Sequence, residues 1–509
     1  MHTFFHIDLL QRRRSIPQTI PRMEIWGYFT ILLILGRILG FVLAADALMT
    51  ARTAQGTLAW VIALILIPEL AIPLYFVFGG RRFVGYVRAR RKGRGELSIL
   101  AARLAEALRE HRRTDSHAET SRDERLAPLE KLVRLPTTVA DRADLLINGE
   151  ATMLAVINAI NRAQTSVVAE YYIIRDDSAG QAFKAALINA ANRGVKVRLI
   201  YDALGSAQLP RAYLNELRTA GIEARSFSGL RFPPTRLQIN FRQHRKIVVV
   251  DGREALLGGV NIGDEYLGKD PKLSPWRDTH LHLVGPSALS VQLAWCEDWF
   301  SITRSIPDLP WQPQTPPRSQ TVDRLSSDND RTLIIPSGPA DDLETCGLMF
   351  NHLFNVAKHR LWIATPYFVP DETTLHALQL AALRGVDVRV IIPEGFDARL
   401  VWLSAFAFYN DTVKAGVKLL RYQPGFMHQK VCLCDDLVAI GTANLDNRSF
   451  RLNFEITAII RSERTRREAQ AMFENDMRQC LIVSPLDYDR RHWFFRVLCR
   501  IARLMAPIQ

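Results

Sequence analysis

The chain has 509 residues, of which 48% are apolar and 23% are charged, a balance that excludes a wholly disordered protein. Sixty-five Lys and Arg against 52 Asp and Glu leave a net charge of +13, so we expect an anionic partner, either nucleic acid or the phosphate face of a membrane. The six cysteines are too sparse for a disulfide framework, and no compact His/Cys spacing of the zinc type occurs. We therefore expect an intracellular protein without a metal.

Two apolar stretches open the chain, at about 25–45 and 58–78. Each has the roughly 20 residues that a helix needs to cross about 30 Å of hydrocarbon. Arginine clusters precede the first stretch and follow the second, whereas the loop between them carries only Arg52, so the positive-inside rule puts both ends in the cytoplasm. The sequence predicts a basic cytoplasmic N-terminus (1–24) and a transmembrane helical hairpin (25–80), with the rest of the chain in the cytosol.

Two charged residues, Arg37 and Glu69, lie near the middle of the predicted spans. An isolated charge there costs about 2.5–3.5 kcal/mol on insertion scales. We expect an ion pair between the two helices, which would offset both costs and fix their packing. The alternative is that the first span inserts poorly and that Arg37 reaches the membrane surface.

The remainder of the chain is organised as a duplication. Residues 81–140 are charged and rich in Ala and Leu, which indicates a basic helical connector. After it, alternating helix and strand patterns predict an α/β layer, and the same order returns later: NRGVKVR at 192–198 is echoed by LRGVDVR 191 positions on. We predict a first domain at 141–306, a linker rich in Pro, Ser and Asp at 307–331 and a second domain at 332–485.

The last segment, 486–509, is predicted to be an amphipathic basic helix. Its apolar residues recur at helical spacing against Arg496, Arg500 and Arg503. Two interpretations stay open, namely that this helix lies on an anionic membrane surface or that it packs on the second domain.

Each predicted domain carries the same motif, a His-x-Lys-x4-Asp run followed by Gly-x-x-Asn. Its members are His244, Lys246, Asp251 and Asn261 in the first copy and His428, Lys430, Asp435 and Asn444 in the second. His and Lys two positions apart on a strand project from one face, so each pair can meet one ligand. The Asp then begins a hairpin turn. The second hairpin is one residue shorter, which leaves the role of Asp435, against neighbouring Asp436, open.

These residue types fit phosphodiester chemistry without a metal or other cofactor. Two Lys and two Asn amides can bind the non-bridging oxygens as charge develops there. One imidazole can attack phosphorus while the other protonates the leaving alkoxide. We therefore expect the His, Lys and Asp residues of both motifs to be catalytic, and Asn261 and Asn444 to bind substrate.

The paired motifs resemble the phospholipase D superfamily. The segments GGVNIGDEYLG, WRDTHLHLVGP, TPYFVPD and GTANLDNRSFRLNFE, together with the N-terminal hairpin, are similar more narrowly to the bacterial cardiolipin synthases. The resemblance implies two duplicated α/β/α domains that form a pseudo-dimer with one active site at their interface. It implies that His244 forms a phosphohistidine, that His428 acts as acid and then as base, and that Asp278 and Glu455 orient these imidazoles.

The reaction implied by the resemblance is phosphatidyl transfer between two phosphatidylglycerol molecules, giving cardiolipin and glycerol. The implied location is the bacterial cytoplasmic membrane, as a multi-pass protein with cytoplasmic catalytic domains and no nucleic-acid partner, and the oligomeric state is left open. Phosphatidylethanolamine as donor stays an alternative. So do a hydrolase that uses water as acceptor, either a lipid phosphodiesterase or a nuclease, and a membrane scaffold without enzymatic activity.

Overall fold

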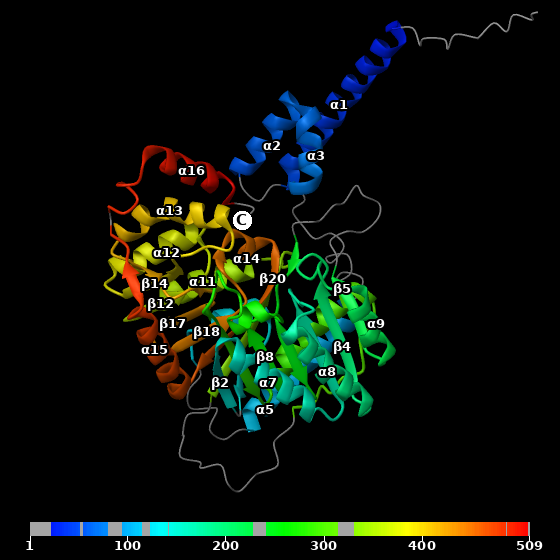
Figure 1. Cartoon of the computed structure of the whole chain (residues 1–509), viewed down its shortest axis with the longest axis vertical. Coiled ribbons are helices and arrows are strands. Elements are labelled where there is room, and N and C mark those ends of the chain that lie inside the picture. Colours follow the sequence, from blue (N-terminus) through cyan, green and yellow to red (C-terminus); the bar gives the residue numbers. More distant parts are fainter. Residues whose placement is uncertain are drawn as a thin grey trace, which may run out of the picture. The chain divides into compact units, whose positions relative to one another are not determined.

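The computed structural model describes residues 22–50, 54–79, 94–114, 123–140, 142–227, 241–313, 330–484 and 486–506. Most of the predicted N-terminal segment 1–24, and 314–329 of the predicted linker, lie outside these ranges. The chain divides into two compact units, residues 1–81 and 82–509 (Figure 1).

The first unit consists of three apolar helices, α1 (Arg22–Thr50), α2 (Ala54–Leu66) and α3 (Pro68–Phe78). Within the described residues, one helix is long and apolar enough to cross a membrane, α1 over Gly27–Met49. The predicted second span is not one continuous helix, because Ile67 leaves the helical conformation with φ −134° and Pro68 starts a new helix. The helices pack closely, and a Cβ on Gly40 of α1 would lie 2.4 Å from the Leu64 carbonyl oxygen of α2.

The predicted ion pair between Arg37 and Glu69 is absent from the contacts of the described residues, and both side chains are exposed. The break before Pro68 explains the difference, because it places Glu69 in the exposed first turn of a separate helix. The described polar contact between these helices is instead a hydrogen bond of 2.7 Å from the Tyr75 hydroxyl to Asp46 Oδ2.

The second unit contains two sheets with the same order of strands. In the first sheet, that order is β2 (Arg142–Ile147), β10 (Thr279–Val284), β8 (Glu254–Gly258), β7 (Ile247–Val250), β3 (Ser166–Tyr171), β4 (Lys196–Asp202) and β5 (Glu223–Phe227). In the second sheet, it is β11 (Asp330–Ser337), β20 (Asn453–Arg461), β18 (Leu437–Gly441), β17 (Val431–Cys434), β12 (Arg360–Ala364), β14 (Asp387–Pro393) and β15 (Lys418–Tyr422). The duplication seen in the sequence is therefore also a duplication of topology, and we call the two parts the first and second halves.

Helices cover both faces of each sheet (Figure 1). The first half contributes α7 (Asn148–Arg162), α8 (Ser178–Asn192), α9 (Arg211–Thr219) and α10 (Ser287–Thr303). The second half contributes α11 (Thr345–Val356), α12 (Glu372–Leu383), α13 (Arg399–Val413), α15 (Glu463–Met477) and α16 (Trp493–Leu504). Residues of α10 and α15 join side chains from both sheets in one continuous hydrophobic core, where Trp295 stacks on Trp299 at 5.1 Å. The two halves thus share an interior.

The predicted connector is partly built into the second half. It contains α5 (Arg94–Thr114), α6 (Ala127–Val133) and β1 (Thr138–Ala140). β1 pairs with β11 at the edge of the second sheet, with Thr138 opposite Thr332, and Leu126 and Leu129 are buried in the outer core of the second half. The chain therefore contributes to the second sheet before it builds the first.

Candidate active site

Two short parallel ladders cross between the halves and position the two motif histidines. Strand β6 (Arg242–Gln243) pairs with β20, and the His244 amide donates to the Phe454 carbonyl at 3.0 Å. Strand β9 (Trp276–Arg277) pairs with β16 (Phe426–Met427), and the His428 amide donates to the Arg277 carbonyl at 2.8 Å. Each histidine is therefore fixed by the backbone of the other half.

The imidazole of His244 contacts a buried carboxylate of the second half. Its Nδ1 lies 2.9 and 3.0 Å from the two oxygens of Glu455, which is 0% exposed. Burial by itself raises the pKa of Glu455, but the adjacent His244 and Lys246 outweigh burial and hold that pKa below its usual value. A charged carboxylate on Nδ1 fixes the ring and its tautomer, and leaves Nε2 for chemistry.

Hydroxyl and amide groups hold Glu455 in place. Thr442 Oγ1 donates to it at 2.6 Å, Ser449 Oγ at 2.9 Å and Asn453 Nδ2 at 3.1 Å. The sequence analysis did not single out Thr442 and Ser449, although both lie in the segment GTANLDNRSF. They extend the site from the imidazole through Glu455 into the second half.

The imidazole of His428 has the reciprocal arrangement. Its Nδ1 lies 2.7 Å from Oδ2 of Asp278, a residue of the first half that is 0% exposed. Burial raises the pKa of Asp278, whereas Lys430 and His428 lower it by more, so its pKa lies below the usual value. The predicted partners, Asp278 for one imidazole and Glu455 for the other, thus make the contacts that an orienting role requires.

Both imidazoles lie in apolar surroundings. The His428 ring is 4.9 Å from the Trp276 ring and 5.9 Å from the Phe426 ring, and the His244 ring is 5.2 Å from Tyr172. Burial lowers the pKa of His244 to about 4, and burial and Lys430 lower the pKa of His428. In the empty site both imidazoles are therefore neutral near pH 7, the form in which an imidazole is a nucleophile.

The two lysines supply the positive charge of the site. Lys246 Nζ donates to the His244 carbonyl at 2.6 Å, and Lys430 Nζ lies 2.9 Å from His428 Nδ1. Burial lowers the pKa of Lys246 to about 7, with a further lowering by Lys430, and burial lowers the pKa of Lys430 to about 8. Because lysines of opposite halves act on one another, the two motifs form one site, which a bound anion would stabilise.

The two asparagines lie in the same buried region. Asn261 Oδ1 accepts from the Ile173 amide at 3.1 Å, and its Nδ2 donates to the Tyr266 hydroxyl at 2.8 Å. Asn444 Nδ2 lies 3.3 Å from Asp446 Oδ2. In the structure their amides thus hold neighbouring groups, and their binding of substrate stays a prediction.

The residues Asp251 and Asp435 lie away from the imidazoles, which corrects the expectation that they are catalytic. The carboxylate of Asp251 accepts from the amides of residues 164–166 at 2.8–2.9 Å, and that of Asp435 accepts from the amides of residues 358–360 at 2.9 Å. Each Asp follows its His by seven positions along extended chain, or about 23 Å. Both close a hairpin turn with positive φ, 52° and 54°. Asp436 instead pairs with Arg125.

Two glycines allow the carboxylate of Asp278 to approach His428. A Cβ on Gly259 would lie 2.0 Å from Asp278 Oδ1, and Gly258 has φ +156° with its Cβ position 2.6 Å from the His280 Cα. A side chain at Gly259 would displace the Asp278 carboxylate, and one at Gly258 would displace the backbone of Thr279 and His280. The sequence signal was the Gly-Gly pair before Val260 and Asn261.

A buried ion pair supports each ladder. The Arg277 guanidinium binds Asp476 of α15 at 2.8 and 2.9 Å, with both side chains nearly inaccessible. Arg245 binds Asp298 of α10 and donates to the Glu455 carbonyl at 3.0 Å. The Arg277–Asp476 pair and the Arg245 bond to the Glu455 carbonyl cross between the halves, so the core shared by the halves also fixes the site.

Comparison with known proteins shows which family the chain is similar to. Residues 156–270 and 350–477 match a family profile described as cardiolipin synthase, PLD-like domain. The chain is 42% identical over 488 residues to cardiolipin synthase A of Pseudomonas aeruginosa, covering 94% of this chain and 96% of that protein. It is 43% identical to cardiolipin synthase A of Pseudomonas putida, with 94% and 98% covered. Its fold is similar to phosphatidylserine synthase of Haemophilus influenzae, with TM-score 0.56 and 16% identity over 76% of this chain and 100% of that chain.

Proposed function

The chain belongs to the bacterial cardiolipin synthases, phosphatidyltransferases of the phospholipase D superfamily, and from this premise we propose that it joins two phosphatidylglycerol molecules into cardiolipin and glycerol. The observation that carries the proposal is the reciprocal pairing of His244 with Glu455 and of His428 with Asp278. Two imidazoles, each fixed at Nδ1 by a carboxylate, can act on opposite sides of one phosphorus atom.

In the first half-reaction, Nε2 of His244 attacks the phosphorus of the donor lipid. The new N–P bond forms as the P–O bond to glycerol breaks, and His428 gives its proton to the departing alkoxide. Lys246 and Lys430 bind the non-bridging oxygens, where negative charge increases. Binding of the anionic phosphate raises the pKa of His428, and Asp278 stabilises the resulting imidazolium.

In the second half-reaction, His428 takes the proton from a hydroxyl of the second phosphatidylglycerol. That oxygen attacks the phosphohistidine, the N–P bond breaks and His244 returns to its neutral form. One phosphodiester replaces another, so the exchange is close to neutral in free energy and needs no nucleotide. In the proposed pseudo-dimer, both half-reactions take place in one site.

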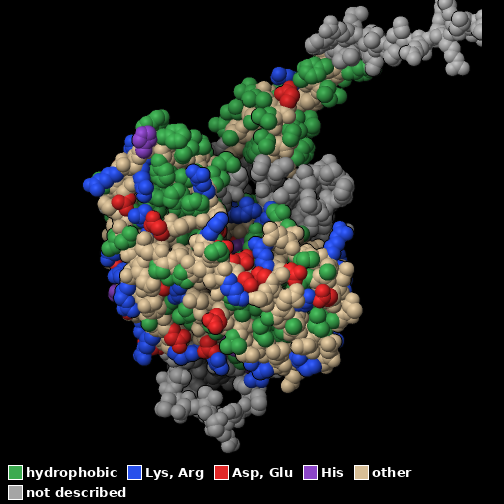
Figure 2. Space-filling view, in the orientation of Figure 1, with side chains coloured by type: hydrophobic (Ala, Val, Ile, Leu, Met, Phe, Trp, Pro, Cys, Tyr) green, Lys and Arg blue, Asp and Glu red, His purple; other side chains and the backbone are tan. Residues whose placement is uncertain are grey.

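The membrane contact is proposed to involve both ends of the chain. Helix α1 supplies one apolar segment of spanning length. The inner face of α16 packs on α13, where Phe495 contacts Trp402 and Phe406. Its outer face exposes Trp493, Phe494, Val497, Ile501 and Leu504, and Figure 2 shows this hydrophobic patch flanked by Lys and Arg side chains.

Both alternatives for the last helix therefore have support: it packs on the second half and presents an apolar, basic face outward. Such a face suits an anionic lipid surface. We place the protein in the bacterial cytoplasmic membrane, with α1 to α3 as a multi-pass anchor and the two halves on the cytoplasmic side. The arginines around the apolar N-terminal segments support this orientation.

The test is turnover of labelled phosphatidylglycerol by the purified protein in mixed micelles, with products separated by thin-layer chromatography. We expect cardiolipin and free glycerol, both lost in His244→Ala. Phosphatidic acid as the sole product would identify a hydrolase. Turnover that begins only when phosphatidylethanolamine is added would keep the mechanism and replace the donor.

A further inference from the structure

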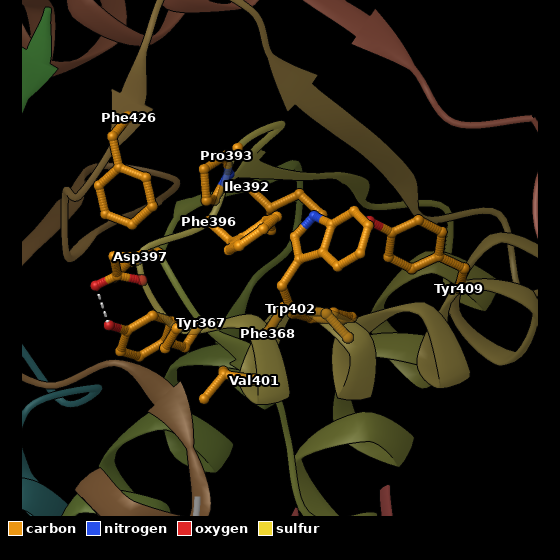
Figure 3. A pocket seen from close by; sticks show the side chains of 14 residues that line it. Tyr367, Phe368, Ile392, Pro393, Phe396, Asp397, Val401, Trp402, Tyr409 and Phe426 are labelled. Atoms are coloured by element: carbon orange, nitrogen blue, oxygen red, sulfur yellow. Dashed lines mark hydrogen bonds between the residues drawn. The ribbon is translucent and has the colours of Figure 1, made fainter. Parts of the chain in front are cut away.

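A small pocket opens beside His428 on the second half, at the ends of β12 and β14 (Figure 3). Its empty space of about 330 Å³ includes the open solvent at its mouth, so the enclosed part is smaller than an ordinary small-molecule site. Aromatic side chains dominate its lining, among them Phe396, Trp402 and Phe426. A ligand would therefore lie across the mouth of the pocket, which suits a small polar headgroup.

One polar pair stands out in this lining. The Tyr367 hydroxyl donates to Asp397 Oδ2 at 2.5 Å, and Figure 3 shows the two side chains facing one another at one end of the pocket. Tyr367 is half-buried, whereas Asp397 is exposed at the mouth. In the part of the chain that the structure describes, no other side chain or amide hydrogen-bonds to Asp397, so its Oδ1 has acceptor capacity toward a ligand.

The polar pair lies close to the His428 side of the active site. Phe426, a wall of the pocket, comes two residues before His428, and the two rings are 5.9 Å apart. The charge of Asp397 also influences His428. Burial and Lys430 lower the pKa of His428, whereas Asp278 and Asp397 raise it. A molecule held by Asp397 would therefore lie beside the proposed general acid and base.

Tyr367 has no counterpart among the described residues of the first half. The two halves can be aligned through the bridges that follow the motif asparagines, Ile174 with Ile262 in the first half and Phe368 with Leu445 in the second. By this register, Tyr367 takes the place of Ile173. At this position only the second half carries a hydroxyl, so the pair is a feature of one half.

We propose that Tyr367 and Asp397 form a polyol subsite that binds the hydroxyls of a glycerol headgroup beside His428. The inference rests on the proposed function and deepens it. In that reaction the departing group is glycerol and the attacking group is the glycerol of the second lipid, so one subsite serves both half-reactions. A carboxylate accepts hydrogen bonds from hydroxyls and repels phosphate, which directs the phosphate toward the lysines.

The subsite also explains how transfer can dominate over hydrolysis. A water molecule that faces His428 has no second hydroxyl with which to reach Tyr367 and Asp397. A glycerol headgroup can donate a hydrogen bond from one hydroxyl to the charged Asp397 while its other hydroxyl faces His428. Binding of the acceptor would thus be favoured in the step that decides between cardiolipin and phosphatidic acid.

The experiment measures the ratio of cardiolipin to phosphatidic acid formed from labelled phosphatidylglycerol by the full-length protein in mixed micelles. Asp397→Asn and Tyr367→Phe keep the shape of the pair, and we expect each to lower the ratio about tenfold. The concentration of free labelled glycerol that gives half-maximal headgroup exchange should rise by a similar factor. Asp411→Asn is the matched control, because it removes the same charge from an exposed position on α13.

A ratio in Asp397→Asn and Tyr367→Phe equal to that of Asp411→Asn would overturn the subsite and leave the proposed function intact. An equal fall in all three variants would also overturn it, because the effect would then not depend on the Tyr367–Asp397 pair. Phosphatidic acid as the sole product of the unmodified protein would reject the proposed function itself, and with it the subsite.

Discussion

His244 and Glu455 stand 211 residues apart in the chain, yet Nδ1 of the histidine lies 2.9 Å from the carboxylate. The reciprocal pair, His428 and Asp278, is 150 residues apart with a separation of 2.7 Å. Each half therefore supplies the carboxylate that orients the imidazole of the other half. Neither half by itself contains both a motif histidine and the carboxylate that contacts it.

Replacing the orienting carboxylates by amides should preserve the fold and slow the reaction. Glu455→Gln and Asp278→Asn place an uncharged amide against Nδ1, so the tautomer and the developing imidazolium lose their support. We expect kcat to fall about 10²–10⁴-fold. The check is kcat together with the melting temperature. For Ser449→Ala, which removes one hydrogen bond to Glu455, we expect a kcat between that of these variants and that of the unmodified protein.

The two histidines should separate into different roles under rapid quenching. His428→Ala retains the nucleophile, so the phosphohistidine forms slowly from ordinary donors and accumulates, because no base activates the acceptor. Acid-labile label on the protein, measured after quenching, should appear in His428→Ala and be absent in His244→Ala. Label bound to His244→Ala would show that the roles are reversed.

The pH dependence follows from the pKa values of the empty site. His244 must be neutral to attack, so kcat/KM should rise as the pH increases through about 4. Lys246 and Lys430 must be protonated to bind phosphate, and with pKa values of about 7 and 8 they lose that charge above neutrality. We expect kcat/KM to be highest near pH 5–6 and to decline from about pH 7, measured on short-chain monomeric phosphatidylglycerol. A flat profile from pH 6 to pH 9 would contradict the assignment.

A single added methyl group should disrupt the site. In Gly259→Ala the Cβ would lie 2.0 Å from Asp278 Oδ1, so the carboxylate that contacts His428 must move, and we expect at least a hundredfold loss of activity. Gly347→Ala is the matched control, because a Cβ at this helical position meets nothing within 4 Å. It should raise stability by about 0.5–1 kcal/mol and keep full activity. The readouts are turnover and denaturant unfolding.

The outer face of α16 should matter for bilayers more than for monomeric substrate. Val497→Glu and Ile501→Glu place charges on side chains that are 41% and 54% exposed, so their effect on folding is small. We expect about a tenfold lower rate on vesicles containing phosphatidylglycerol. Leu154→Glu, at a 62% exposed position on α7, is the control. Equal losses on vesicles and on short-chain monomers would contradict a membrane role for this face.

The sequence predicted the elements whose signal is local. The paired motifs and their flanking segments indicated the family, which the comparisons confirm, and the 191-residue echo indicated two similar α/β halves. The pairing of Asp278 with one imidazole and Glu455 with the other came from the resemblance. Spacing alone gives no information on contacts between residues so far apart.

The failures have physical reasons. Asp251 and Asp435 belong to the motif, but a strand separates them from the imidazoles, and their carboxylates hold backbone amides. Hydropathy averaged over 58–78 does not register the helix break that Pro68 introduces. The pairing of β1 with β11 is a contact between distant segments that no periodicity reports.

Tyr367 in the second half takes the position that Ile173 takes in the first half, and this difference has a consequence for how such an enzyme can evolve. In an assembly of two identical subunits, any substitution beside one histidine appears beside the other, so both sides must bind the same groups. A fused duplicate removes that constraint. One side can acquire a tyrosine while the other keeps an isoleucine, and the two histidines can then specialise for opposite ends of one reaction without either losing the partner on which it depends.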